Sequence, residues 1–217
     1  MIDRIIFNNV VPQAFIVDGS FSGHSDVWGE NIMFEKESNY LIEAASGTGK
    51  TTLCSYIMGT RNDYRGEILF DNIDIRKLNV KQWSQVRQTG IGWLSQELDL
   101  FPDLTVNDNI RIKNSLTSYR TQNYIANLLE RLGIIEKRDV HVKLLSLGQR
   151  QRVAFIRMLC QPADFFILDE PVSHLDNANN ILLSAILVEV LKETGAGAII
   201  TSVGNRLELP GLKVFTL

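Results

Sequence analysis

The chain has 217 residues with 22 Lys+Arg and 25 Asp+Glu, so its formal net charge is −3. At roughly 150 residues per domain, this length predicts one large domain, or one domain with an inserted lobe, and a substantial buried core. With 45% hydrophobic and 22% charged residues, the composition is that of a globular protein and argues against disorder and low complexity. The slightly acidic total argues against a general nucleic-acid binder, which usually carries a basic excess.

The cysteines and the apolar runs bear on the compartment. Cys54 and Cys160 lie far apart in apolar surroundings, which is typical of buried thiols in a reducing compartment and not of a disulfide. The first residues lack the apolar length and cleavage site of a secretory signal. No apolar run approaches the roughly 18 residues that span a bilayer, since residues 181–191 are interrupted by Ser184 and Glu189. We expect a soluble chain that reaches a membrane only through a partner.

Two kinds of pattern follow each other along the chain. Residues 14–17, 32–34 and 66–75 are short β-type runs beside turn residues, which predicts an antiparallel sheet at the start of the domain. Elsewhere, strand patterns alternate with helical ones, which predicts right-handed crossovers and a mainly parallel sheet covered on both faces. The fold class is therefore α/β. These alternating elements are expected at residues 40–43, 165–168 and 198–201 as strands and at residues 50–58 and 178–194 as helices.

The middle of the chain has a different pattern. Between residues 103 and 160 there is no strong strand signal, whereas residues 123–132 and 149–159 place apolar side chains at helical spacing. This predicts a helical lobe, at about residues 97–160, inserted into the α/β core. No linker flanks it, so residues 1–217 are expected to form a single domain.

A strand, a small-residue loop and a helix start follow each other in residues 40–53, Tyr-Leu-Ile-Glu-Ala-Ala-Ser-Gly-Thr-Gly-Lys-Thr-Thr-Leu. This is the context of a phosphate-binding loop. Gly47 and Gly49 let successive backbone N–H groups face phosphate oxygens. Lys50 supplies a charge for the β and γ phosphates, and Thr51 offers its hydroxyl to Mg²⁺. The alternative is a glycine-rich helix cap that binds no ligand. The expected nucleotide-binding residues of the loop are Ser46, Gly47, Thr48, Gly49, Lys50, Thr51 and Thr52.

A second motif, residues 165–171, is an apolar strand that ends in Asp169 and Glu170. Burying adjacent unpaired carboxylates is costly, and parallel sheets bind their ligands at the carboxyl ends of the strands. Asp169 is placed to support Mg²⁺, directly or through water, and Glu170 to face an attacking water. The alternative is that both acids cap the next helix.

Two further segments complete a set of four motifs. Residues 92–109 contain Gln96, and residues 145–157 contain Leu-Ser-Leu-Gly-Gln. In this order and spacing the motifs resemble the nucleotide-binding subunit of an ATP-binding-cassette (ABC) transporter over essentially the whole chain. Residues 96–105 most resemble the branch for lipoprotein release, macrolide export and cell division. The resemblance implies a P-loop NTPase core with ATP and Mg²⁺ as cofactors.

The resemblance also implies roles for particular residues. Gln96 would contact the metal and the attacking water and sense the membrane partner, and Lys50 and Glu170 complete the catalytic set. Thr51, Gln96 and Asp169 would hold the metal. Phe21, seven residues before Trp28, would stack on adenine, although an ordinary core position is nearly as good an explanation. The remaining implied contacts are Ser146, Gly148 and Gln149, which would reach the γ-phosphate of the opposite subunit, and Asp176, which would couple the two sites.

Three positions depart from the family pattern. Ala44 replaces the first glycine of the phosphate loop, Leu147 the first glycine of L-S-G-G-Q, and Val203 the histidine that contacts the γ-phosphate. Losing one preorganised polar contact to a transition state costs about 10²- to 10³-fold in rate. The expectation is a Mg²⁺-dependent ATPase with weakened hydrolysis. The alternative is an ATP-binding regulatory or scaffold subunit with little or no hydrolysis, paired with a more active cassette.

The expected partners follow from the resemblance. They are a second ABC subunit, as homodimer or heterodimer, and an integral membrane permease, with the chain peripheral on the cytoplasmic face of the membrane. No nucleic-acid partner is expected, because Arg150, Arg152 and Arg157 share a helix with apolar residues and fit a solvated helix face. The histidines, His24, His141 and His174, are not positioned in the sequence to replace the missing one.

Overall fold

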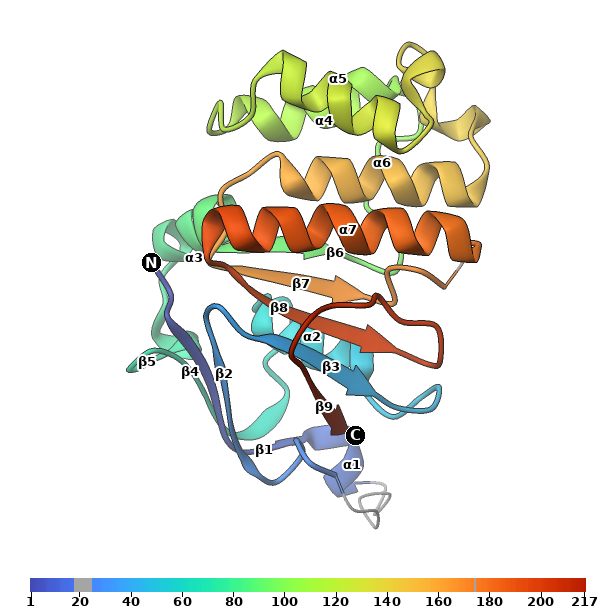
Figure 1. The fold of residues 1–217 in the computed structure, drawn as a ribbon. Coiled ribbons are helices and arrows are strands. Elements are labelled where there is room, and N and C mark those ends of the chain that lie inside the picture. Colours follow the sequence, from blue (N-terminus) through green and yellow to red (C-terminus); the bar gives the residue numbers. More distant parts are fainter. Residues whose placement is uncertain (18–24, 174) are drawn as a thin grey trace.

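The computed structural model describes residues 1–17, 25–173 and 175–217. It contains two sheets (Figure 1), an antiparallel one in the order β2-β1-β4-β5 and a five-stranded one in the order β6-β7-β8-β3-β9. Every pairing in the second sheet is parallel, as predicted for an α/β protein. The strands are β1 (Arg4–Pro12), β2 (Asn31–Glu35), β3 (Asn39–Glu43), β4 (Tyr64–Phe70), β5 (Ile73–Asp74), β6 (Ile91–Leu94), β7 (Phe165–Asp169), β8 (Gly197–Ser202) and β9 (Leu212–Thr216).

Helices cover both faces of the parallel sheet. In Figure 1, α6 and α7 lie over one face with α4 and α5 stacked beyond them, and α2 lies on the other side with the antiparallel sheet. The helices are α1 (Gln13–Val17), α2 (Lys50–Ile57), α3 (Val80–Gln85), α4 (Val106–Ser115), α5 (Gln122–Arg131), α6 (Leu147–Leu159) and α7 (Asn177–Thr194). Short turns of 3-10 helix lie at Ile75–Lys77, Ile135–Lys137 and Val142–Leu144, and a π-helical turn, Val86–Gly90, follows α3. The part of the chain that the structure describes contains no helix long and apolar enough to cross a membrane.

The parallel sheet separates two hydrophobic cores. On β7, Phe165 and Ile167 pack with α2 and the antiparallel sheet, whereas Phe166 and Leu168 pack with α4, α5, α6 and α7. Successive side chains of a strand point to opposite faces, so both faces of β7 must be apolar. This explains why the strand is a continuous apolar run in the sequence.

One element prediction was wrong. Residues 14–17, expected as a strand, form helix α1. The last residue pair between β1 and β4 is Pro12 with Tyr64, and the Gln13 N–H then donates to the Asp63 carbonyl. Beyond that point residues 14–17 have no strand to pair with, and the backbone forms a helix instead.

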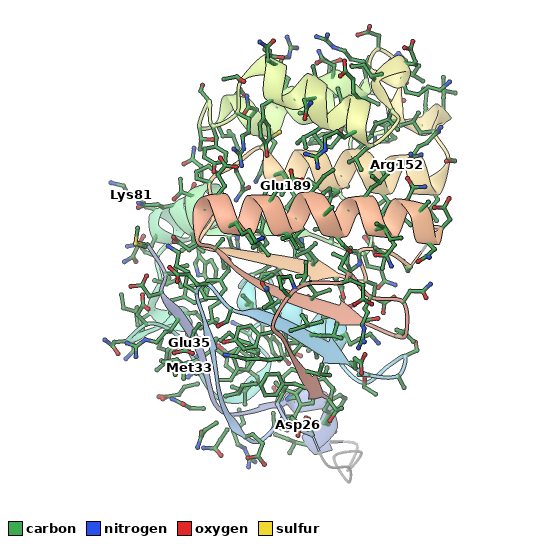
Figure 2. The ribbon with its side chains drawn as sticks, in the orientation of Figure 1. Asp26, Met33, Glu35, Lys81, Arg152 and Glu189 are labelled. Carbon is green, nitrogen blue, oxygen red and sulfur yellow. The ribbon has the colours of Figure 1, made fainter. Side chains whose placement is uncertain are left out.

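The helix-face arginines also differ from expectation. Arg152 and Arg157 are half-buried, not solvated. On α6 (Figure 2), the Arg152 Nη1 donates to the Leu132 carbonyl over 2.7 Å, and the Arg157 guanidinium lies 5.5 Å from the centre of the Phe101 ring. Long basic side chains bury their apolar stems in this way. These arginines therefore hold the helical segments together. Cys54 and Cys160 are free and, as predicted, buried.

Candidate nucleotide-binding site

The phosphate loop joins β3 to α2. Gly47 and Gly49 have φ of 85° and 101°, the left-handed region that glycine adopts without steric cost. The Trp28 Nε1 donates to the Thr48 carbonyl over 3.3 Å and so helps to hold the loop in place. Ala44, the departure from the strict pattern, is not among the described residues with positive φ. Alanine is therefore accommodated there without left-handed strain.

Lys50 is held inside this loop, with only 4% of its side chain exposed. Its Nζ donates to the Ala44 carbonyl over 3.1 Å and to the Ala45 carbonyl over 2.8 Å. The same Nζ lies 3.5 Å from the Glu170 Oε1. A buried ammonium needs such partners because its desolvation is costly. The two predicted motifs therefore meet through this ion pair.

Asp169 and Glu170 lie at the carboxyl end of β7, as predicted. Asp169 is 1% exposed, and its Oδ1 accepts a hydrogen bond of 2.6 Å from the Thr201 hydroxyl. Its Oδ2 is buried without a hydrogen-bond partner. An unsatisfied buried carboxylate oxygen is costly, and oxygen atoms are the ligands that Mg²⁺ prefers. An unpartnered carboxylate oxygen at this position therefore fits a magnesium ion.

Thr51 and Gln96 add two more oxygen atoms at this end of the sheet. The Thr51 hydroxyl and the Gln96 Oε1 are 3.5 Å apart. Within the described ranges, no group of three or more His, Cys, Asp or Glu side chains could hold a metal ion.

A pocket of ≈ 250 Å³ opens beside the phosphate loop, Gln96 and Glu170, and the buried Asp169 is not among its lining residues. Sequence reasoning missed one of its walls, Phe15 on α1, whose ring packs edge-on against Trp28 at a centroid distance of 6.4 Å. The signal that could have found Phe15 is an aromatic residue just after the first strand. Phe21, predicted to stack on adenine, lies outside the described residues. The pocket is lined by Phe15, Ser46, Gly47, Gly49, Lys50, Thr51, Thr52, Gln96 and Glu170.

The residues predicted to act across a dimer lie elsewhere in the chain. Ser146 caps α6 in a capping box: its hydroxyl accepts from the Gln149 N–H, and the Gln149 Oε1 accepts from the Ser146 N–H over 3.0 Å. Asp176 caps α7 by accepting from the Asn179 N–H over 2.8 Å, which lowers the pKa of its carboxyl. Neither these side chains nor Gly148 lines the pocket. The structure of one chain therefore leaves the predicted trans contacts separate from the phosphate loop.

Val203 follows β8 and is 54% exposed. Its isopropyl group cannot replace the hydrogen bond of a histidine. His141 is on the helical lobe, where its Nδ1 lies 2.8 Å from the Asp103 carbonyl oxygen. His24 and His174 lie outside the described residues.

A phosphate loop lies between parallel strand β3 and helix α2, and an acidic pair lies at the end of β7, which β8 separates from β3. This arrangement defines the P-loop class of nucleotide-binding domains. The family model described as ABC transporter matches residues 30–173, more than half of the chain. The chain belongs to the ABC transporter family.

Known proteins agree with this assignment. The chain is 28% identical over 201 residues to the methionine import ATP-binding protein MetN of Cutibacterium acnes, a match covering 91% of this chain and 54% of that protein. It is 30% identical over 177 residues to the lipoprotein-releasing system ATP-binding protein LolD of Buchnera aphidicola, with 79% and 76% covered. The chain thus spans about half the length of MetN. The ATP-binding cassette MJ0796, solved with ADP and Pi, superposes with a TM-score of 0.74 at 22% identity, covering 93% of this chain and 88% of that one.

Proposed function

We propose that this chain is the ATP-binding and ATP-hydrolysing subunit of an ABC transporter, acting as one cassette over residues 1–217 with a helical lobe at about residues 97–160. The observation that carries the proposal is the Lys50–Glu170 ion pair, which joins the phosphate loop to the end of β7, where the preceding Asp169 keeps an unpartnered buried Oδ2. Structural ion pairs alone do not explain a buried carboxylate oxygen that lacks a partner.

The residues of the pocket and the buried Asp169 behind it have separate roles in the proposed phosphoryl transfer. The loop N–H groups and Lys50 bind the β and γ phosphates. Thr51, Gln96 and Asp169 would hold Mg²⁺, which when bound neutralises charge on the phosphates. Glu170 orients water and accepts its proton; its present partner, the Lys50 Nζ at 3.5 Å, must then bind phosphate instead. Phe15, which lines the pocket, can stack on the base.

A second cassette would complete the site. Ser146 and Leu147 are exposed at the start of α6, where free N–H groups and the positive end of the helix favour an anion. Because the pocket of one chain is open to solvent, another cassette that presents this helix end would close it over the γ-phosphate. ATP would then hold two cassettes together, and hydrolysis would release them.

The permease would bind on the helical-lobe side. Two adjoining hollows there, of ≈ 200 and ≈ 460 Å³, share Arg87 and Lys113. Val80 and Leu116 line the larger hollow and are 87% and 54% exposed. Burial and the Arg157 charge lower the pKa of Lys113. An apolar hollow with close cations fits a permease segment that carries an apolar face and an acidic side chain. Binding of such a segment would hold the chain on the cytoplasmic face of the membrane.

The proposal is tested with Glu170→Gln. This variant keeps the side-chain volume but removes the proton acceptor, so ATP should bind and the dimer should persist. Size-exclusion chromatography with light scattering, in ATP and Mg²⁺, should report twice the monomer mass, whereas the wild-type chain should return to monomer as ATP is consumed. A Glu170→Gln chain that binds no ATP would contradict the proposal.

Val203 and Leu147 favour a second candidate, an ATP-binding regulatory or scaffold subunit with little hydrolysis. Turnover measured together with the permease separates the two functions. Val203→His should raise turnover by about tenfold or more if the missing polar contact limits the reaction. An unchanged turnover would mean that this position does not limit hydrolysis.

A further inference from the structure

One hydroxyl contacts both residues of the acidic pair. Thr201, on β8, is 0% exposed and lies directly opposite Asp169 in the parallel register of β7 and β8. Its Oγ1 donates to the Asp169 Oδ1 over 2.6 Å and accepts from the Glu170 N–H over 3.1 Å. The Thr201 hydroxyl is therefore at once a hydrogen-bond donor to Asp169 and an acceptor from Glu170.

The first hydrogen bond fixes the Asp169 carboxylate. The terminal torsion of an aspartate is broad, so an isolated carboxylate can present either oxygen. A short hydrogen bond to a charged oxygen is among the strong ones, and here it ties down Oδ1. The other oxygen, Oδ2, is left buried and unpartnered, available to a cation.

The second hydrogen bond fixes the Glu170 backbone. Glu170 has φ of 50°, a left-handed conformation that residues other than glycine seldom adopt. Such strain persists where the surroundings enforce it and is concentrated at functional sites. The Thr201 hydroxyl captures the N–H of this strained residue, whose carboxylate reaches the Lys50 Nζ.

We propose that Thr201 is a positioning residue of the nucleotide site: its hydroxyl aims Asp169 Oδ2 at the metal of a metal–nucleotide complex and holds Glu170 in its left-handed conformation. This inference rests on the proposed ATP-binding function. A buried threonine that only satisfied a backbone N–H would have no need of the bond to the carboxylate. The function thus requires a hydroxyl at a buried strand position that directly follows Ile199 and Ile200 of the core.

The test compares ATP affinity with and without metal. Thr201→Val keeps the shape of the side chain and removes the hydroxyl. ATP affinity should then fall about 10- to 100-fold in Mg²⁺, the usual effect of losing a group that orients a metal ligand, and stay unchanged in EDTA. Thr201→Ser should retain the wild-type affinity in both buffers. If Thr201→Val fails to fold, Thr201→Ala removes the same hydroxyl without the added methyl group.

Thr194→Val is the matched control. The Thr194 Oγ1 also donates one hydrogen bond, to the Val190 carbonyl over 2.8 Å, and accepts one, from the Ala196 N–H over 3.2 Å, but at the far end of α7. The Thr194→Val chain should have the same ratio of ATP affinities in Mg²⁺ and in EDTA as the wild type. An unchanged ratio in the Thr201 variants, or an equal loss in both buffers, overturns the inference. Failure of the wild type to bind ATP at all would instead overturn the proposed function.

Discussion

A chain with glycine at position 170 should be more stable than one with alanine, the reverse of the usual order. Glu170 has φ of 50°, and an L-residue in this region costs about 1–2 kcal/mol. Glycine avoids that cost but loses about 0.5–1 kcal/mol more conformational entropy than alanine on folding. Because Glu170→Ala and Glu170→Gly both remove the ion pair with Lys50, their difference isolates the backbone. Glu170→Gly should be the more stable by roughly 0.5–1 kcal/mol.

Urea unfolding of the nucleotide-free chain measures this difference. Ala185, on the exposed face of α7, provides the control, because Ala185→Gly in an ordinary helix should be less stable by about 1 kcal/mol. Both position-170 variants should also lose about 10²- to 10⁴-fold in turnover, the usual contribution of a general base. If Glu170→Ala is at least as stable as Glu170→Gly, the left-handed backbone at position 170 is not strained and the reasoning fails.

Three further changes test the account elsewhere. Gly92→Ala should destabilise the fold by about 1–3 kcal/mol in urea unfolding, because the new Cβ would lie 2.5 Å from the Phe166 ring; equal stability would mean that β6 has room to move. Phe15→Ala should weaken ATP affinity roughly tenfold in a titration, the usual worth of a ring stacked on a base, and an unchanged affinity would remove Phe15 from the site. Glu189 lies on α7 (Figure 2), and its hydrogen bond with Arg131 lowers the pKa of its carboxyl. This pair therefore stabilises the fold fully above the ordinary carboxyl pKa, and the stabilisation is lost as pH falls through the lowered pKa. Unfolding from pH 7 to 3 should show that Glu189→Gln removes that pH dependence, at a cost below about 1 kcal/mol at neutral pH since the carboxylate is 59% exposed; a larger cost would contradict the surface assignment.

Elements with a strong periodic pattern were predictable from the sequence. The apolar run at residues 165–168 and the helical pattern at residues 178–194 appear as β7 and α7. By contrast, β9 has no fully buried residue, and its place beside β3 depends on a pairing between distant parts of the chain. Residues 14–17 have β-type side chains but no partner strand, so context overrode local propensity.

The site divides in the same way. Gly47, Gly49 and Lys50 were recognisable because their chemistry depends on local spacing, and the structure places them together. Phe15 and Thr201 were missed because their roles depend on contacts across the fold, with Trp28 and with Asp169. The position of Phe15 just after the first strand is a weak signal, and the contact of Thr201 with Asp169 leaves no pattern in the neighbouring sequence.

The helix arginines illustrate how burial escapes a sequence pattern. Alternation of Arg with apolar residues on α6 suggested a solvated face, yet Arg152 donates to a carbonyl at the end of α5. The Arg152 Nη1 thus satisfies the carbonyl of Leu132, the C-cap residue of α5. Such caps from another element depend on tertiary packing alone.

ATP binding by the wild-type chain and by Lys50→Ala tests the central claim most directly. Lys50 is buried in the phosphate loop beside Glu170, and its charge has no substitute in the pocket. Calorimetric titration in Mg²⁺ should show a saturable site with one ATP per wild-type chain and no binding by a folded Lys50→Ala chain. Absence of binding by the wild type, or equal affinity in the two proteins, would contradict the account.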